Sequence, residues 1–212
     1  MIERVKTRKT RDIGIFYNKI YSKGGYLSEA DFNKRALSIM GVEKDKDKKL
    51  LDVACGQGTL LAQAEDHVNT YGIDISKEAI KKAKVRARKT IFKICAAEKL
   101  PFPKSFFDYV TCMGSLEHFI DIDAALREIK RVTKKNGRVL IHVPNSNYLI
   151  HRILGIDTQG QINERLATEE EWNKILEKYF TIEKVYKYNT RWYFKWVPKN
   201  YCCHFTFLCR NK

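Results

Sequence analysis

The stretch Leu50-Leu51-Asp52-Val53-Ala54-Cys55-Gly56-Gln57-Gly58 decides the fold of this 212-residue chain. Its short apolar run is typical of a buried strand, and the two glycines allow a sharp turn into a helix. In an open parallel sheet, ligands bind beyond the carboxyl ends of the strands, near the point where strand order reverses. The stretch therefore predicts a strand, a tight turn and a ligand site at one place.

Short apolar runs alternate with amphipathic segments from Leu50 to Val143. This alternation is typical of a parallel sheet that is covered by helices on both faces. We predict strands over residues 49–54, 70–73, 91–95, 107–113 and 138–143. We predict helices between them over residues 58–65, 76–89 and 123–133.

The chain on either side of this core follows other patterns. Two helices are predicted before it, over 13–21 and 28–40, with Gly24-Gly25 between them and Ser28 as the cap of the second. After Pro144 we predict a helix over 145–154, a polar stretch over 155–165, a helix from the capping box Thr168-Glu169-Glu170-Glu171 to Lys178, and strands over 181–188 and 201–210. We find no repeat or linker, so one domain over residues 1–212 is expected.

The formal net charge is +15, from 40 Lys and Arg against 25 Asp and Glu. Such a field attracts nucleic acid, anionic lipid or an acidic small molecule, and it does not choose among them. Much of the excess lies in residues 1–11, 44–49 and 77–89, where solvated helix faces and loops are the alternative. Because the sequence has no long apolar run and no signal-peptide pattern, we expect a cytoplasmic protein without a membrane span.

The sequence also bears on metals and disulfides. The six cysteines fall mostly in apolar runs without a CxxC pair, so reduced, buried thiols are expected. Asp121 and Asp123 lie close to His118, but carboxylates just before a helix are expected to cap it. No metal site is predicted.

An acidic residue follows the glycine turn at a spacing that suits a nucleoside site. Asp74 ends the next apolar run, eighteen residues after Gly56, where a carboxylate can accept hydrogen bonds from both hydroxyls of a ribose. A dinucleotide site would need a third glycine where Leu61 stands, so NAD is disfavoured. Asp52 instead suits a cationic amino acid moiety. The alternative is a tight turn without a ligand.

With these residues the chain resembles the class I S-adenosylmethionine-dependent methyltransferases, in particular the small-molecule type with a hydrophobic-Asp-Val-x-Cys-Gly-x-Gly first motif. The resemblance covers residues 50 to 143 and rests on four motifs in order. It implies that Ala54, Gly56 and Gly58 line the methionine part of S-adenosyl-L-methionine. Asp74 would hold the ribose, and Ile75 would flank the adenine.

The third and fourth motifs resemble residues 96–102 and 107–118. The third implies that the amide of Ala97 lies near the adenine edge. Where the family often has Asp, this chain has Ala96, so the hydrogen bond to the adenine amino group is expected from Glu98, backbone or water. The fourth implies that Met113 and Gly114 lie alongside the cofactor.

The resemblance also implies the architecture. We expect a doubly wound, Rossmann-like α/β fold with a mostly parallel seven-stranded sheet that ends in an antiparallel strand pair. Residues 1–45 would form an N-terminal helical cap, 46–144 the cofactor-binding core, and 145–212 a substrate or lid segment with the last strands.

Methyl transfer needs little from the protein beyond positioning, because the sulfonium donor is already activated. If the acceptor is a hydroxyl, a base helps, and His118 is the candidate since neutral imidazole takes a proton near neutral pH. The alternative is that His118 packs beneath the cofactor. Tyr17 resembles aromatic residues that close over the cofactor in related enzymes, and ordinary helix packing is its alternative.

The acceptor is the least determined feature. Met113-Gly114-Ser115 stands where enzymes that methylate base amines often have a Pro-Pro-aromatic turn, and no Pro precedes a cysteine as in carbon-5 pyrimidine enzymes. We therefore expect transfer to O or N of a small metabolite, sugar or lipid-like acceptor, including an acidic one. An RNA methyltransferase stays open because of the basic, aromatic run of residues 191–196. A cofactor-binding, non-catalytic partner subunit also stays open, as does the oligomeric state.

Overall fold

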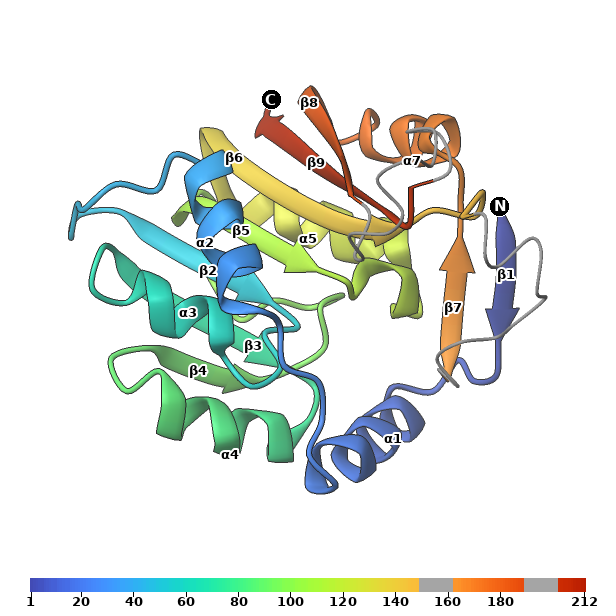
Figure 1. The fold of residues 1–212 in the computed structure, drawn as a ribbon, viewed down its shortest axis with the longest axis horizontal. Coiled ribbons are helices and arrows are strands. Elements are labelled where there is room, and N and C mark those ends of the chain that lie inside the picture. Colours follow the sequence, from blue (N-terminus) through green and yellow to red (C-terminus); the bar gives the residue numbers. More distant parts are fainter. Residues whose placement is uncertain (149–161, 189–201) are drawn as a thin grey trace.

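The computed structural model describes residues 1–148, 162–188 and 202–212 (Figure 1). In chain order the elements are β1 (Ile2–Val5), α1 (Thr10–Ser22), α2 (Ala30–Ile39), β2 (Lys49–Val53), α3 (Thr59–Ala64), β3 (Asn69–Asp74), α4 (Lys77–Arg86), β4 (Ile91–Ile94), β5 (Phe107–Met113), the 3₁₀ turn η1 (Leu116–His118), α5 (Ile122–Val132), β6 (Thr133–Pro144), β7 (Asn163–Leu166), α7 (Glu169–Leu176), β8 (Phe180–Tyr188) and β9 (His204–Asn211).

The main sheet has seven strands in the order β4-β3-β2-β5-β6-β9-β8. Strands β2 to β6 pair in parallel, whereas β9 pairs antiparallel with both β6 and β8. The chain leaves β2 toward β3 and β4 and then returns to place β5 on the other side of β2. This reversal leaves a crevice at the carboxyl ends of the central strands. The predicted doubly wound, mostly parallel sheet with a final antiparallel pair is confirmed.

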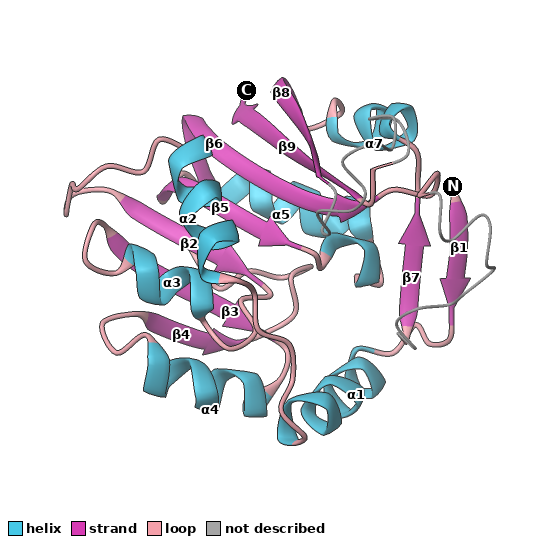
Figure 2. Ribbon diagram, in the orientation of Figure 1, coloured by secondary structure: helices cyan, strands magenta, loops and turns pink. Residues whose placement is uncertain are grey.

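Helices cover both faces of the sheet (Figure 2). Helices α2, α3 and α4 pack on one face, and α5 and α7 pack on the other. Successive side chains of a strand point to opposite faces, so Leu50 of β2 packs in the first layer and Leu51 in the second. Because both faces are covered, a central strand must be apolar throughout, which explains the uninterrupted run in the sequence.

Three predicted caps form as expected. Asp121 caps α5, since its carboxylate accepts the amide hydrogen of Ala124 at 2.9 Å. The Ser76 hydroxyl accepts the amide hydrogen of Ala79 at the start of α4. The capping box between Thr168 and Glu171 is present at the start of α7. Strand β6 begins at Thr133, earlier than predicted, and α5 therefore ends at Val132.

The predicted cap of α2 is wrong. The helix begins at Ala30 after Glu29, and Ser28 lies outside it. The hydroxyl of Ser28 contacts the side chains of Asn33 and Thr59 instead. Ser28 thus joins the segment before α2 to the start of α3. Its hydroxyl makes a tertiary contact instead of the helix cap that the local sequence pattern predicts.

A second, two-stranded sheet was not predicted. β1 pairs antiparallel with β7, with Val5 opposite Asn163. Figure 1 shows this small sheet near α1, beyond the carboxyl ends of the parallel strands. The N-terminal cap is therefore not purely helical, and the stretch predicted as polar and irregular contains a strand.

The predicted helix over 145–154 is wrong for its described part. Asn145 bridges to Ala167, and residues 146–148 are not helical. Residues 149–154 lie outside the described residues, as does the aromatic run 191–196. All six cysteines are free, and only Cys95 among them is more than slightly exposed.

Across the described ranges, every helix is too short or too polar to cross a membrane. The same ranges contain no group of three His, Cys, Asp or Glu side chains that could hold a metal ion.

Candidate functional site

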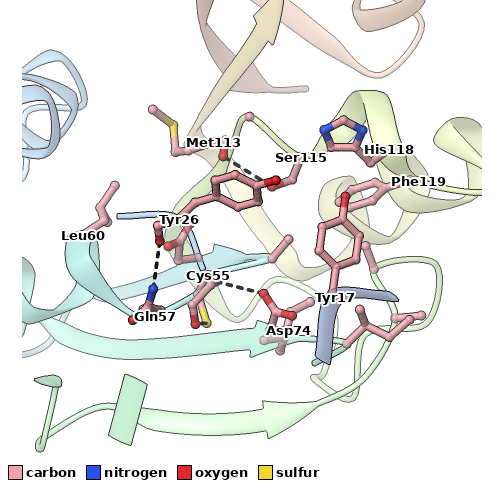
Figure 3. A pocket seen from close by; sticks show the side chains of 18 of the residues that line it. Tyr17, Tyr26, Cys55, Gln57, Leu60, Asp74, Met113, Ser115, His118 and Phe119 are labelled. Atoms are coloured by element: carbon pink, nitrogen blue, oxygen red, sulfur yellow. Dashed lines mark hydrogen bonds between the residues drawn. The ribbon is translucent and has the colours of Figure 1, made fainter. Parts of the chain in front are cut away.

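A cavity of about 260 Å³ lies at the carboxyl ends of β2, β3, β4 and β5, where α1 and the segment that follows it also contribute (Figure 3). Of the residues predicted for the site, eleven line this cavity: Tyr17, Asp52, Ala54, Gly56, Asp74, Ile75, Ala97, Glu98, Met113, Gly114 and His118. Gly58 does not line it. The fold thus brings together residues that are up to about 100 positions apart in the sequence.

The glycine turn joins β2 to α3. Gly56 and Gly58 both have left-handed backbones, with φ of 52° and 72°. A Cβ on Gly56 would lie 2.8 Å from the hydroxyl of Tyr21, so this contact and the left-handed backbone both favour glycine. A Cβ on Gly58 would lie 3.1 Å from the Cβ of Ala83. Gly58 therefore lets α3 and α4 approach, rather than opening the cavity.

Asp74 ends β3 and holds the turn. One carboxylate oxygen accepts the amide of Gly56 at 2.9 Å, and the other accepts the amide of Ser76 at 2.8 Å. The side chain is buried, and burial raises the pKa of Asp74 to about 6, although the backbone amides oppose this shift. The carboxylate as a whole can accept about four hydrogen bonds, so it retains acceptor capacity beyond these amides.

Asp52 lies at the end of β2 and is also buried. It accepts a hydrogen bond of 2.7 Å from the hydroxyl of Thr111 in the neighbouring strand. Burial, and then the charge of Asp74, raises the pKa of Asp52 to about 7. Two carboxylates thus lie close enough to repel each other at the cavity floor.

The residues that follow β4 form another wall of the cavity. Ala97 is buried and lines the cavity. Glu98 also lines it, and its Oε1 accepts the amide of Ile120 at 3.1 Å. This hydrogen bond joins the loop after β4 to the loop after η1, so Glu98 holds two walls of the cavity together.

The end of β5 forms a third wall. Gly114 has φ of 62°, and its amide donates to the carbonyl of His142 at 2.8 Å. A Cβ on Gly114 would meet no atom within 4 Å, so this backbone borders open space. His142 of β6 lines the cavity as well, and its ring contacts Phe32 edge-on at 5.0 Å.

His118 lies on the same side of the cavity as Tyr17, across from Gln57 and Leu60 (Figure 3). Its Nδ1 lies 2.5 Å from the carbonyl oxygen of Asn163. A carbonyl can only accept, so Nδ1 carries the hydrogen and Nε2 carries the lone pair of the neutral ring. Burial lowers the pKa of His118, which favours that neutral form at pH 7.

The residue before it is also buried. Glu117 Oε1 lies 3.6 Å from Nε2 of His118, and burial raises the pKa of Glu117 to about 8. A neutral carboxyl beside a neutral imidazole avoids two buried charges.

The segment of residues 23–29 between α1 and α2 is fixed to the glycine turn. The amide nitrogen of the Gln57 side chain donates to the carbonyls of Gly24 and Tyr26, at 2.7 and 3.2 Å. Lys82 of α4 also donates to the carbonyl of Gly24, at 3.2 Å. These contacts hold α1, with Tyr17, in place beside the cavity.

Comparisons with known proteins identify the family. The profile of a family described as "Methyltransferase domain" matches residues 44–192, which is well over half of the chain. The chain belongs to the class I S-adenosylmethionine-dependent methyltransferases. Proteins of this family take the methyl group from S-adenosyl-L-methionine.

Curated relatives of this methyltransferase-family chain align with part of its length. It is 35% identical over 111 residues to the uncharacterized methyltransferase YcgJ of Bacillus subtilis, covering 50% of this chain and 44% of that protein. It is 36% identical over 149 residues to the ubiquinone/menaquinone biosynthesis C-methyltransferase UbiE of Burkholderia ambifaria, covering 64% and 61%. The chain thus spans about half the length of the curated relatives it matches.

The fold also occurs in the crystal structure of the [4+2]-cyclase SpnF. The two share a TM-score of 0.75 at 16% identity, over 98% of this chain and 97% of that one. This similarity shows the fold alone.

The cavity of this methyltransferase-family chain fits S-adenosylmethionine. The described part of its lining includes three carboxylates and no Lys or Arg, although the net charge of the chain is +15. Carboxylates favour a ligand with a sulfonium and an ammonium over one with phosphates. Asp74 retains acceptor capacity for hydroxyls, and Gly114 borders open space where a methyl group and an acceptor could meet.

Several lining residues were missed by the sequence analysis. Tyr21 is one helical turn after Tyr17, and that i, i+4 spacing predicts a shared face. His142 is a polar residue near the end of an apolar strand, and that position could have indicated that it lines a ligand cavity. Gln57 and Phe32 carried no local signal, because their roles depend on contacts between distant segments.

The raised pKa values of Asp52 and Asp74 predict that cofactor binding depends on pH. A cationic ligand prefers ionised carboxylates, so affinity should weaken about 10-fold between about pH 8 and about pH 5.5. In the free protein both pKa values lie above the ordinary 3.8, so these groups favour the fold at low pH and disfavour it as the pH rises through 6 to 7. Titration calorimetry between about pH 5.5 and about pH 8 measures the expected change in cofactor affinity. Asp52→Asn should shift the midpoint of this pH dependence toward the lower pKa of Asp74. An affinity that does not change with pH would contradict the placement of the cofactor beside these carboxylates.

Proposed function

We propose that this protein transfers the methyl group of S-adenosylmethionine to an oxygen or nitrogen of a small metabolite, sugar or lipid-like acceptor. The observation that carries the proposal is the acidic cavity at the glycine turn. The family to which the chain belongs uses this cofactor. The cofactor contacts are proposed for Asp52, Ala54, Gly56, Asp74, Ile75, Ala97, Glu98, Met113 and Gly114.

The chemistry of the transfer is a direct displacement. When bound, S-adenosylmethionine supplies a methyl group on a positively charged sulfur. The new bond forms between the acceptor and this carbon, the bond from sulfur to carbon breaks, and the acceptor loses a proton. We assign that proton to Nε2 of His118, which holds the lone pair because Nδ1 donates to Asn163.

The N-terminal cap would keep water out of this reaction. Tyr17 and Tyr21 line the cavity from α1, and burial raises the pKa of both phenols far above the usual value, so both stay neutral. Neutral aromatic rings add an apolar cover to the cavity and bring no further buried charge. Excluding water strengthens the electrostatic interactions inside the cavity.

Three alternatives have some support. Exposed basic residues on α4, among them Lys77, Lys81 and Lys84, would attract RNA. The relative UbiE is named as a C-methyltransferase, which would make carbon the acceptor atom. SpnF shares the fold and is named as a cyclase, so the fold alone does not imply methyl transfer, and a cofactor-binding partner subunit is the third alternative.

One labelling experiment separates these functions. The protein is incubated with methyl-labelled S-adenosylmethionine and cell extract, with and without RNase. We expect label in an RNase-resistant small product, whose NMR spectrum shows a methyl group on O or N. A methyl group on carbon would support the chemistry named for UbiE. Label that RNase removes would support an RNA acceptor, and cofactor binding by calorimetry without any labelled product would support a partner subunit.

A further inference from the structure

Asn163 lies at the junction between the small sheet and the cavity. It is fully buried at the start of β7, opposite Val5 of β1. Its backbone carbonyl accepts the hydrogen of His118 Nδ1. The orientation of the proposed base is therefore set by the position of β7 rather than by its own segment alone.

The side chain of Asn163 contacts a different part of the chain. Its Oδ1 accepts the amides of Lys6 and Thr7, at 3.0 and 3.2 Å, and its Nδ2 donates to the carbonyl of Thr7 at 2.9 Å. An amide side chain can satisfy a donor and an acceptor on the same neighbour, which no apolar residue of its size can do. Lys6 and Thr7 follow β1 directly, so these bonds fix the exit of the first strand.

Thr7 passes this constraint on to α1. Its hydroxyl donates to Asp12 Oδ2 at 2.8 Å and accepts the amide of Lys9 at 3.1 Å. Helix α1 carries Ile13, which also lines the cavity together with Tyr17. One buried side chain thus connects the cover of the cavity with the hydrogen bond that sets the tautomer of His118.

We propose that Asn163 is a positioning residue that couples the placement of α1 over the cavity to the tautomer and orientation of His118. The inference rests on the proposed role of His118 as the base. Without the side chain, the three bonds to Lys6 and Thr7 are lost, and only the backbone pairing of β1 with β7 holds the carbonyl of residue 163. The carbonyl can then move away from Nδ1 of His118, which weakens the preference for hydrogen on Nδ1 and for the lone pair on Nε2.

The tautomer can be measured without knowledge of the acceptor. NMR of isotope-labelled histidine ring nitrogens reports which nitrogen of His118 carries the hydrogen, and hydrogen exchange reports the opening of α1. In the unmodified protein we expect Nδ1–H. In Asn163→Ala we expect a mixture with Nε2–H and amide exchange in α1 that is about 10-fold faster. Asn163→Asp keeps an acceptor for Lys6 and Thr7 and should show a smaller change, which provides a second variant if Asn163→Ala folds poorly.

Asn211 provides a matched control. It is a buried asparagine on β9 whose Nδ2 also donates to backbone carbonyls, those of Lys130, Thr133 and Lys134. Asn211→Ala should lower stability to a similar degree and leave the His118 tautomer unchanged. An unchanged tautomer in both Asn163 variants, or the same change in Asn211→Ala, would overturn the inference. If the tautomer shifts as expected but the unmodified protein transfers a methyl group to no acceptor in the labelling experiment, the positioning role of Asn163 stands and the proposed function fails.

Once the acceptor is identified, turnover adds a second readout. Asn163→Ala should lower kcat about 10-fold and leave KM for S-adenosylmethionine within about 2-fold, because a displaced base affects the transition state more than cofactor binding. A rise in that KM alone would show that Asn163 supports only the cofactor site.

Discussion

Asp74→Ala is expected to weaken S-adenosylmethionine binding by about 100-fold or more, the largest loss of affinity for any single change in the cavity. Two hydrogen bonds from ribose hydroxyls to a charged acceptor contribute about 3 kcal/mol or more. The change also removes the acceptor for the amides of Gly56 and Ser76, so the glycine turn loses its support. Titration calorimetry on the folded variant measures the effect.

Asp66 provides the control for this change. It is an exposed aspartate that pairs with Lys89 on the surface, where such pairs contribute little to stability. Asp66→Ala should bind the cofactor normally. If Asp74→Ala is folded and keeps its affinity, the ribose does not bind at Asp74, and the orientation proposed for the cofactor is wrong.

His118→Ala is expected to lower turnover by about 100-fold and to leave cofactor affinity nearly unchanged. The imidazole takes the proton that the acceptor loses, and its absence leaves that proton to water. The acid limb of the pH profile of kcat in the unmodified protein should lie below the ordinary pKa of 6.5, because burial lowers the pKa of His118. Turnover is measured with labelled cofactor and the identified acceptor.

The exposed His67 is the matched histidine, and His67→Ala should have normal turnover. If His118→Ala loses cofactor affinity but retains kcat, the ring packs beneath the cofactor and does not act as a base. Normal kcat and normal affinity together would remove His118 from both roles.

The sequence was sufficient for the parts of the fold that depend on neighbouring residues. The alternation of apolar runs and helices predicted the central sheet, and the capping residues Ser76 and Thr168 marked two helix starts correctly. The turn at Gly56 and the carboxylate at Asp74 were found because their spacing follows from one strand, one helix and the next strand. Their roles toward the cofactor stay predictions.

Features that depend on distant segments were not found. Ser28 has the local pattern of a helix cap, but it contacts Thr59 instead. β1 and β7 each have only four residues and many polar side chains, and neither is recognisable without its partner. Asn163 was overlooked for the same reason, since nothing near it in the sequence indicates that it contacts both Thr7 and His118.

The pairing of β1 with β7 has a consequence for how the protein folds. Ile2 lies opposite Leu166, so this contact closes a loop of more than 160 residues. Closing so long a loop costs chain entropy, and the few hydrogen bonds of a four-residue ladder do not offset that cost by themselves. The main sheet must first bring the two strands close together. The small sheet should therefore form late, and a chain still emerging from the ribosome can build the glycine turn before it can complete the cover of the cavity. Cofactor that meets such a chain would find an open crevice.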